Sequence, residues 1–280
     1  MKVGAFVVCC VACGGVLDEP GDGAVDASQT SEASKDVTQA FDVAAPDVSI
    51  DDGVPGPPIC PIATANLVAY FPLDVDTLDH SGHGNDATAT NLTSTQGVVN
   101  GAKHFDGATS KLHVSAGAAT LSGARTLCAW MKSDATQGAG QPVFWGGASG
   151  SGDFYAVFSN APSNTTCSKT VPNALYVDHW STDCIEASLP PVMPMKWTFA
   201  CWAYDGGAIK MSVDGNENKA PGSLYDYPLT TLFIGSTLGS GTTTNGSFAG
   251  DLDEVSVWSK ALQQSEVQSL WNGGAGCVLP

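Results

Sequence analysis

Short apolar runs, separated by turn residues, recur from residue 67 to residue 258 and restrict the folds open to this chain. They are rich in Val, Ile, Tyr, Phe and Trp, which favour β-strands, while Gly, Asn, Asp and Ser lie between them. Asp106-Gly107, Asp205-Gly206 and Asp214-Gly215 are typical of hairpin turns, because glycine accepts a positive φ angle. The predicted strands are 67–73, 85–91, 111–114, 125–132, 154–159, 174–180, 197–204, 209–213, 232–234 and 249–258.

One helix is predicted near the end of the chain, over residues 263–271. Val267, Leu270 and Trp271 form its apolar face, and Gly273-Gly274 ends it. Many short strands and almost no helix predict an all-β fold, an antiparallel two-sheet jelly-roll sandwich with one short C-terminal helix.

The charge of the chain is unevenly distributed. The formal net charge is −17, and residues 14–59 carry ten acids, one base and a single aromatic residue, Phe41. Such a segment cannot bury enough apolar surface to offset its conformational entropy, so we expect an acidic disordered linker. Residues 60–280, with nearly all the aromatic residues, form the predicted domain. The 11 basic residues are scattered, which argues against nucleic-acid binding because phosphates require a positive surface.

Residues 1–13 are predicted to be an export signal. Lys2 precedes an apolar stretch, residues 3–12, that is too short to span a bilayer. Its end, Cys10-Val11-Ala12-Cys13, resembles the lipobox of bacterial lipoproteins, in which the last cysteine is lipidated. The resemblance implies a lipid anchor on Cys13 and, because Gly14 follows, an outer-membrane location. A plain secretory signal, and hence a secreted protein, is the alternative.

Six cysteines follow the signal region, an even number that suggests three disulfides in an exported domain. Six cysteines allow fifteen connectivities. Position favours one pair that brackets the domain, one that closes a local loop around a strand, and one that joins two apolar strands. In that order, the predicted pairs are Cys60–Cys277, Cys167–Cys184 and Cys128–Cys201.

Seven motifs follow one another along the predicted domain. They are LVAYFPLD (67–74), DHSGHGNDA (79–87), GAKHFDGATSKLHV (101–114), TLCAWMK (126–132), KWTFACWAYDGGAIKMSVDG (196–215), LFIGS (232–236) and FAGDLDEVSVWSKALQQSEVQSLWN (248–272). Their order resembles the LamG-like jelly roll of the concanavalin A-like lectin/glucanase superfamily over nearly all of residues 66–272. The resemblance implies a module that binds glycans or proteins and is usually non-enzymatic.

Glucanases of this superfamily place acids at alternating positions of one strand, and retaining glycosidases need two carboxylates close together. The nearest string here is Asp251-Leu252-Asp253-Glu254-Val255, in which the third acid position is Val255. The sequence therefore predicts that the protein is not an enzyme. A divergent glycoside hydrolase is the third alternative for its function.

Strand alternation places Asp253 on the face of Val255 and Val257, which we expect to look inward. A buried carboxylate is costly unless donors or a cation compensate it. The resemblance implies a structural calcium between the first strands and the last one, with Asp79, Asn85 and Asp253 as candidate ligands. The alternative is a carboxylate that accepts backbone N–H groups and fixes a turn.

Exposed aromatic side chains matter for ligand binding, because sugar rings stack on them. Alternation puts Tyr176, Asp178 and Trp180 on one face of a predicted strand, and Trp145 and Tyr155 lie in the same section, 135–195, which matches no shared motif. These five residues are the predicted carbohydrate site; the alternative is that the rings pack under loops or between sheets. We therefore expect an exported, lipid-anchored, monomeric module that recognises carbohydrate. The alternative partner is a cell-surface protein, bound by an adhesion or scaffolding module.

Overall fold

The computed structural model describes ten stretches of the chain, all in the second of its two compact units, residues 53–280. The described residues are 55–115, 121–134, 141–147, 154–159, 175–179, 183–186, 191–221, 229, 231–237 and 247–280. The predicted signal region, with Cys13, and the predicted linker up to residue 54 lie outside them. No helix in these ten stretches has the length and apolarity needed to cross a membrane.

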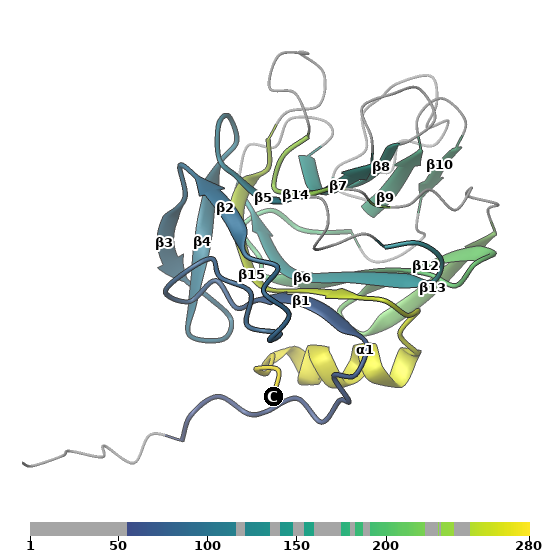
Figure 1. Cartoon of the computed structure of the whole chain (residues 1–280), viewed down its shortest axis with the longest axis horizontal. Helices are drawn as coiled ribbons and strands as arrows, with labels where there is room; N and C mark the ends of the chain where they lie inside the picture. The colour runs from purple at the N-terminus through teal and green to yellow at the C-terminus, as the bar shows by residue number, and fades with distance from the viewer. Residues whose placement is uncertain are drawn as a thin grey trace, which may run out of the picture. The chain divides into compact units, whose positions relative to one another are not determined.

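Two antiparallel sheets form a sandwich (Figure 1). The eight-stranded sheet has the order β13 (Asn216–Pro221), β12 (Ala208–Val213), β11 (Thr198–Tyr204), β6 (Arg125–Ser133), β15 (Ala249–Trp258), β4 (Gly101–Asp106) and β3 (Thr93–Gln96), with β1 (Leu67–Phe71) also paired to β15. The seven-stranded sheet has the order β10 (Asp183–Glu186), β9 (Leu175–His179), β8 (Phe154–Ser159), β7 (Gln141–Gly147), β14 (Leu232–Ile234), β5 (Lys111–Val114) and β2 (Ala87–Thr90). The predicted all-β, two-sheet fold is confirmed.

All ten predicted strands are present, and their ends differ from the prediction by at most two residues. Five further strands were not predicted. β3, β10 and β13 lie at sheet edges, and their sequences, TSTQ, DCIE and NENKAP, have no run of apolar residues. β4 and β7 contain glycines, which weaken a strand pattern. The predicted helix is present as α1 (Gln264–Trp271), followed by the 3₁₀ turn η1 (Asn272–Gly274).

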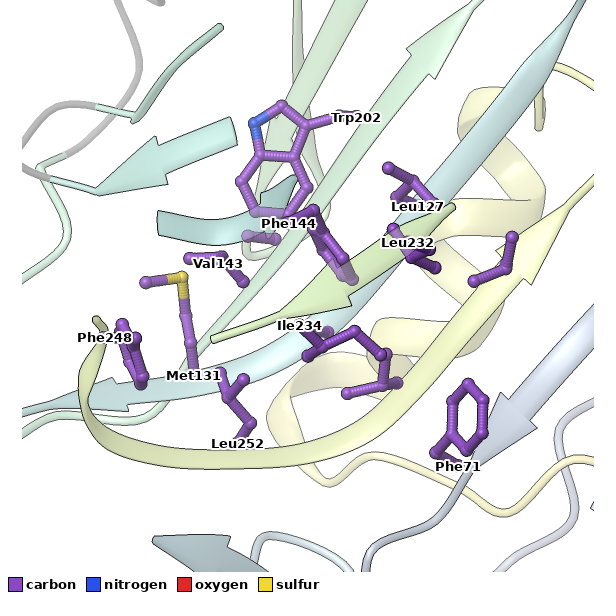
Figure 2. Close-up of a cluster of buried hydrophobic side chains, with 14 of the residues drawn as sticks. Phe71, Leu127, Met131, Val143, Phe144, Trp202, Leu232, Ile234, Phe248 and Leu252 are labelled. Atoms are coloured by element: carbon purple, nitrogen blue, oxygen red, sulfur yellow. The ribbon is translucent and has the colours of Figure 1, made fainter. Parts of the chain in front are cut away.

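The main core lies between the two sheets. Figure 2 shows Met131 and Leu252, from the eight-stranded sheet, near Val143 and Ile234 of the seven-stranded sheet. Alternating residues of both sheets fill this space, because successive side chains of a strand point to opposite faces. Burial of such side chains is the main stabilising term of a sandwich, at roughly 25 cal/mol for each Å² of apolar surface.

A second core lies between the outer face of the eight-stranded sheet and α1, and we call it the helix-side cluster. In Figure 1, α1 lies on the side of that sheet away from the seven-stranded sheet. The cluster consists of Cys60, Leu67, Tyr70, Cys128, Trp130, Phe199, Cys201, Trp258, Leu262, Val267, Leu270 and Cys277. At the start of α1, Gln263 and Glu266 form a capping box, which satisfies backbone N–H groups that lack a helical partner.

Two disulfides lie in the helix-side cluster, and both were predicted. Cys60–Cys277 joins the two ends of the domain, and Cys128–Cys201 joins directly paired residues of β6 and β11. For the third predicted pair, Cys167 and the side chain of Cys184 lie outside the described part of the chain. That pair stays a prediction.

The two disulfides are expected to stabilise the domain unequally. Replacing either pair by alanines is expected to lower the free energy of unfolding by about 2–4 kcal/mol. The pairs close loops with sequence separations of 217 and 73 residues, and chain entropy favours the longer one by about 1 kcal/mol. Urea unfolding of C60A/C277A and C128A/C201A measures both effects. If C60A/C277A unfolds at the same urea concentration as the parent, the Cys60–Cys277 disulfide contributes nothing to the free energy of unfolding.

Candidate functional site

One cross-strand row of residues spans every strand of the seven-stranded sheet, and we call it the outer row. Its members, in register from β2 to β10, are Thr88, His113, Phe233, Trp145, Ala156, Asp178 and Cys184. The residues next to it in β5 and β14, among them Leu112 and Leu232, belong to the core between the sheets. Because strand residues alternate between faces, Thr88, His113, Phe233 and Trp145 occupy the face away from that core.

Three aromatic rings at the middle of the outer row contact one another. His113 and Phe233 stack with ring centroids 4.2 Å apart, and Trp145 meets Phe233 edge-on at 5.7 Å. Such pairs add to the stability given by burial alone. Phe233 is 5% exposed and Trp145 is 3% exposed, whereas His113 is half-buried. The aromatic centre of the row is therefore covered, and its β5 end is accessible.

The imidazole of His113 is held in place by its neighbours. Its Nε2 atom lies 2.9 Å from Oγ1 of Thr231, whose hydroxyl also donates to the carbonyl of Val114. Burial, and next the positive charge of Lys111, lower the pKa of His113 below its usual value. The imidazole is therefore neutral at pH 7 and acts as a hydrogen-bonding group there.

The five predicted sugar-binding residues are only partly brought together. Trp145 and Asp178 share the outer row, and Tyr176 lies two residues from Asp178 on β9 but is 1% exposed. Tyr155 is in register with Gly146 and His179, which places it in a different row. Trp180 lies outside the described residues. Binding of carbohydrate by these residues stays a prediction.

His113 and Phe233 were missed as candidate residues, although the sequence contained the signal for them. Each alternates with core residues in a correctly predicted strand, His113 between Leu112 and Val114, and Phe233 between Leu232 and Ile234. An aromatic side chain flanked by two inward-facing residues must occupy the opposite face.

The prediction that Asp253 faces inward with Val255 and Val257 is wrong. Asp253 pairs with Trp130 and Ser256 pairs with Cys128, so two residues of β15 lie opposite one residue of β6. This is a β-bulge, and Glu254 adopts the left-handed conformation within it, with φ at 51°. The extra residue reverses the alternation, so Asp253 and Glu254 both lie on the helix side of the sheet.

The carboxylate of Asp253 fixes a loop that crosses the outer face of the sheet. Its Oδ2 atom accepts hydrogen bonds from the backbone N–H groups of Val98 and Val99, at 2.8 and 3.0 Å. The loop approaches so closely that a Cβ atom on Gly97 would lie 2.6 Å from that oxygen and 2.0 Å from the carbonyl oxygen of Gly101. Asp253 therefore acts here as an acceptor of backbone N–H groups, one of the two roles expected for it.

Glu254 lies beneath the C-terminal segment. The Tyr70 hydroxyl donates a hydrogen bond to Oε2 of Glu254 and accepts one from the backbone N–H of Leu279. Glu254 also lines a cavity of about 10 Å³, together with Trp130 and Cys277. That volume is about what one water molecule needs.

The bulge places two carboxyl groups, those of Asp253 and Glu254, in buried surroundings. Burial raises the pKa of Asp253 to about 7, and the nearby charge of Asp74 adds to the effect. Burial also raises the pKa of Glu254 to about 9, against the opposing hydrogen bond from Tyr70. Oδ1 of Asp253 and Oε1 of Glu254 are buried and accept no hydrogen bond. Both carboxyl groups therefore favour the protonated form more than an exposed carboxyl does.

The predicted calcium ligands do not form one group in the structure. The carboxylate of Asp79 accepts hydrogen bonds from the backbone of Tyr70, Ser81 and Asn85 and from the Ser81 hydroxyl. Asn85 donates from its amide to the carbonyl of Val68. Within the described ranges no three His, Cys, Asp or Glu side chains are grouped as a metal site requires. Calcium binding stays a prediction.

Comparison with protein families tests whether the chain belongs to the superfamily that its motifs resemble. Residues 85–268 match the concanavalin A-like lectin/glucanases superfamily, and this range is more than half of the chain. The chain belongs to that superfamily. The resemblance of the motifs to this superfamily is thereby confirmed.

Related proteins cover the domain in part or with low identity. Human neuronal pentraxin-1 is 29% identical over 162 residues, which are 52% of this chain and 33% of the relative. The chain thus spans about a third of that protein. Domain 4 of AbnA, an extracellular arabinanase from Geobacillus stearothermophilus, in complex with arabinotriose, has a TM-score of 0.59 at 18% identity and covers 72% of this chain and 97% of its own. A Trypanosoma rangeli sialidase in complex with sialic acid has a TM-score of 0.57 at 14% identity. The match covers 80% of this chain and 36% of the sialidase chain.

The prediction that the protein is not an enzyme is overturned by these matches. An arabinanase and a sialidase, both enzymes, contain chains of this fold. The missing run of alternating acids in β15 is therefore no ground for excluding an enzyme.

The buried carboxyl group of Glu254 is expected to make stability depend on pH. Its folded pKa of about 9 lies above the unfolded value of about 4.3, so the folded state binds more protons than the unfolded state between these values. The free energy of unfolding should therefore fall as the pH rises from 5 to 9. In Glu254→Gln the fall should be smaller by about 1 kcal/mol or more, since one pKa unit corresponds to about 1.4 kcal/mol.

Urea unfolding at several pH values measures this slope. Glu217→Gln is the matched control, because Glu217 is a surface partner of Lys210 at 3.8 Å. Equal slopes in the parent and Glu254→Gln would show that Glu254 ionises normally in the folded domain.

Proposed function

We propose that the domain is a carbohydrate-binding module and that the outer row is its binding face. The observation that carries this proposal is the contiguous group of His113, Phe233 and Trp145 across three neighbouring strands. Sugar rings present apolar faces that pack on aromatic rings, and ligand sites combine such rings with a few polar groups. Thr88 and Thr231 supply hydroxyl groups beside His113.

The opposite side of the sandwich is less suited to this role. α1 lies against the outer face of the eight-stranded sheet, and large side chains of that face are used in the helix-side cluster. Membership of the lectin/glucanase superfamily and the likeness to an arabinanase domain in complex with arabinotriose support a carbohydrate ligand. Covered rings such as Trp145 would have to become accessible when ligand binds.

Removing the tryptophan of the outer row is expected to abolish binding. A panel of oligosaccharides that includes arabinotriose and laminarin fragments is titrated by calorimetry. Trp145→Ala should weaken binding about tenfold or more, because aromatic anchors dominate such sites. Trp271→Ala is the matched control, since Trp271 lies on α1 and packs against Gly215 on the other side of the sandwich.

Thermal unfolding of both variants checks that they remain folded. Equal binding by Trp145→Ala and the parent would remove the outer row as the site. No binding to any glycan would favour the alternative, an adhesion or scaffolding module with a protein partner.

We also propose that the protein is exported and lipid-anchored through Cys13, as a monomeric module. The two disulfides support an oxidising compartment, because cytosolic thiols are kept reduced. The predicted lipobox supports the anchor, and acyl chains contribute about 0.8 kcal/mol for each buried CH₂ group.

Replacing the lipidated cysteine should release the protein from membranes. In a bacterial host, Cys13→Ser is expected to move the protein from the membrane pellet to the soluble fraction, detected by immunoblot. Cys10→Ser keeps Cys13 and serves as the control. A Cys13→Ser protein that still pellets with the membranes would contradict the anchor.

A further inference from the structure

We infer that the glycan bound at the outer row carries a negative charge, which Lys111 receives beside His113 at the β5 end of the row. The inference rests on the proposed carbohydrate-binding function and adds the chemical class of the ligand. The residues concerned lie at the solvent-accessible β5 end of the outer row, where a ligand would make its first contacts.

The accessible end of the face is made of polar, donor-rich side chains. Lys111 and His113 lie two residues apart on β5 and so share its outer face. Thr90 is in register with Lys111, and Thr88 with His113. Thr88 is exposed, and Lys111 and His113 are half-buried, as are Thr90 and Thr231. Three hydroxyls, an ammonium and an imidazole are therefore gathered beside the covered ring of Phe233.

Lys111, like Lys103 and Lys196, has no carboxylate partner among the described residues, whereas three other lysines of this acidic domain have one. Lys132 pairs with Asp251 at 2.6 Å, Lys210 with Glu217 at 3.8 Å, and Lys260 with Glu266 at 2.5 Å. Lys103 is buried and donates to the carbonyl of Val75 and the hydroxyl of Ser94.

The charged side chain beside His113 on β5 is the ammonium of Lys111. Lys111 is the charged group that acts on His113, and its charge lowers the pKa of the imidazole. The side chains that adjoin His113 from β2 and from the start of β14 are the uncharged Thr88, Thr231 and Phe233. A carboxylate brought by a ligand could pair with the ammonium of Lys111, and charge-assisted hydrogen bonds of this kind are about twice as strong as neutral ones.

A sugar that bears a carboxylate fits this arrangement better than a neutral sugar. Its charged group would pair with Lys111, its hydroxyl groups would exchange hydrogen bonds with Thr88, Thr90 and Thr231, and its ring would extend toward Phe233. A neutral sugar offers Lys111 only hydroxyl acceptors, which bind an ammonium less strongly than a carboxylate does.

Calorimetry with the full chain tests the inference by comparing trigalacturonate with uncharged arabinotriose. We expect trigalacturonate to bind about tenfold more tightly or more, and this preference to shrink when NaCl is raised from about 50 mM to about 500 mM. Lys111→Met should reduce the preference to about twofold or less. Lys196→Met is the matched control, because Lys196 is an exposed lysine that precedes β11 of the other sheet and should leave the preference unchanged.

The outcomes separate the inference from the function on which it rests. Equal affinity for the two trisaccharides, with both lost in Trp145→Ala, would overturn the inference and leave the carbohydrate-binding function standing. A preference for trigalacturonate that survives in Lys111→Met would also overturn it. Absence of binding to every glycan of the panel would overturn both. Thermal unfolding of Lys111→Met confirms that its fold is intact.

Discussion

The pairing of β15 is the constraint on which the eight-stranded sheet depends. One edge of this strand pairs with β6, while the other pairs first with β4 and then with β1. Two strands cannot occupy the same edge, so β15 must change partner along its length, and the bulge at Asp253 and Glu254 lies at that point. The bulge twists the strand locally; the carbonyl of Pro72 accepts the backbone N–H of Glu254, and the carboxylate of Asp253 accepts the backbone N–H of Val98. Two buried carboxyl groups with raised pKa values accompany this exchange of partners.

The two outer faces of the sandwich serve different purposes. The helix side contains both described disulfides, the helix-side cluster and the buried acids. The hydrogen bonds of Tyr70 with Glu254 and Leu279 tie β1, β15 and the C-terminal segment together, and Cys60–Cys277 joins the two ends of the domain. The outer row lies on the opposite side, so its residues are not required for that closure. A ligand-binding face can then vary in sequence while the closing face maintains stability, as expected where sites are added to a stable scaffold.

The sequence was sufficient for the strands that alternate cleanly, for α1 and for two disulfides, because burial leaves a period of two or 3.6 residues in the chain. It was insufficient where the pairing of a strand with its neighbours, rather than the hydrophobic period of its own residues, decides the structure. The polar edge strands β3 and β13 form because a neighbour offers hydrogen bonds. The orientation of Asp253 was wrong because a bulge adds one residue, and nothing local in Asp-Glu-Val marks it. The outer row joins residues from strands distant in sequence, so only the register brings Trp145 to Phe233 and His113.

The Cys60–Cys277 disulfide gives the domain a mechanical property. The segments on either side of it also pair directly, with Cys60 donating to Val278 and Val278 donating to Pro58 at 2.8 and 2.9 Å. Tension applied between the chain before Cys60 and the chain after Cys277 passes through the sulfur–sulfur bond, so the fold between them is not stretched. A pull between an N-terminal anchor and a ligand held on the outer row would instead enter at Cys60 and divide between β1 and the C-terminal segment. Neither strand would then be peeled from the sheet alone.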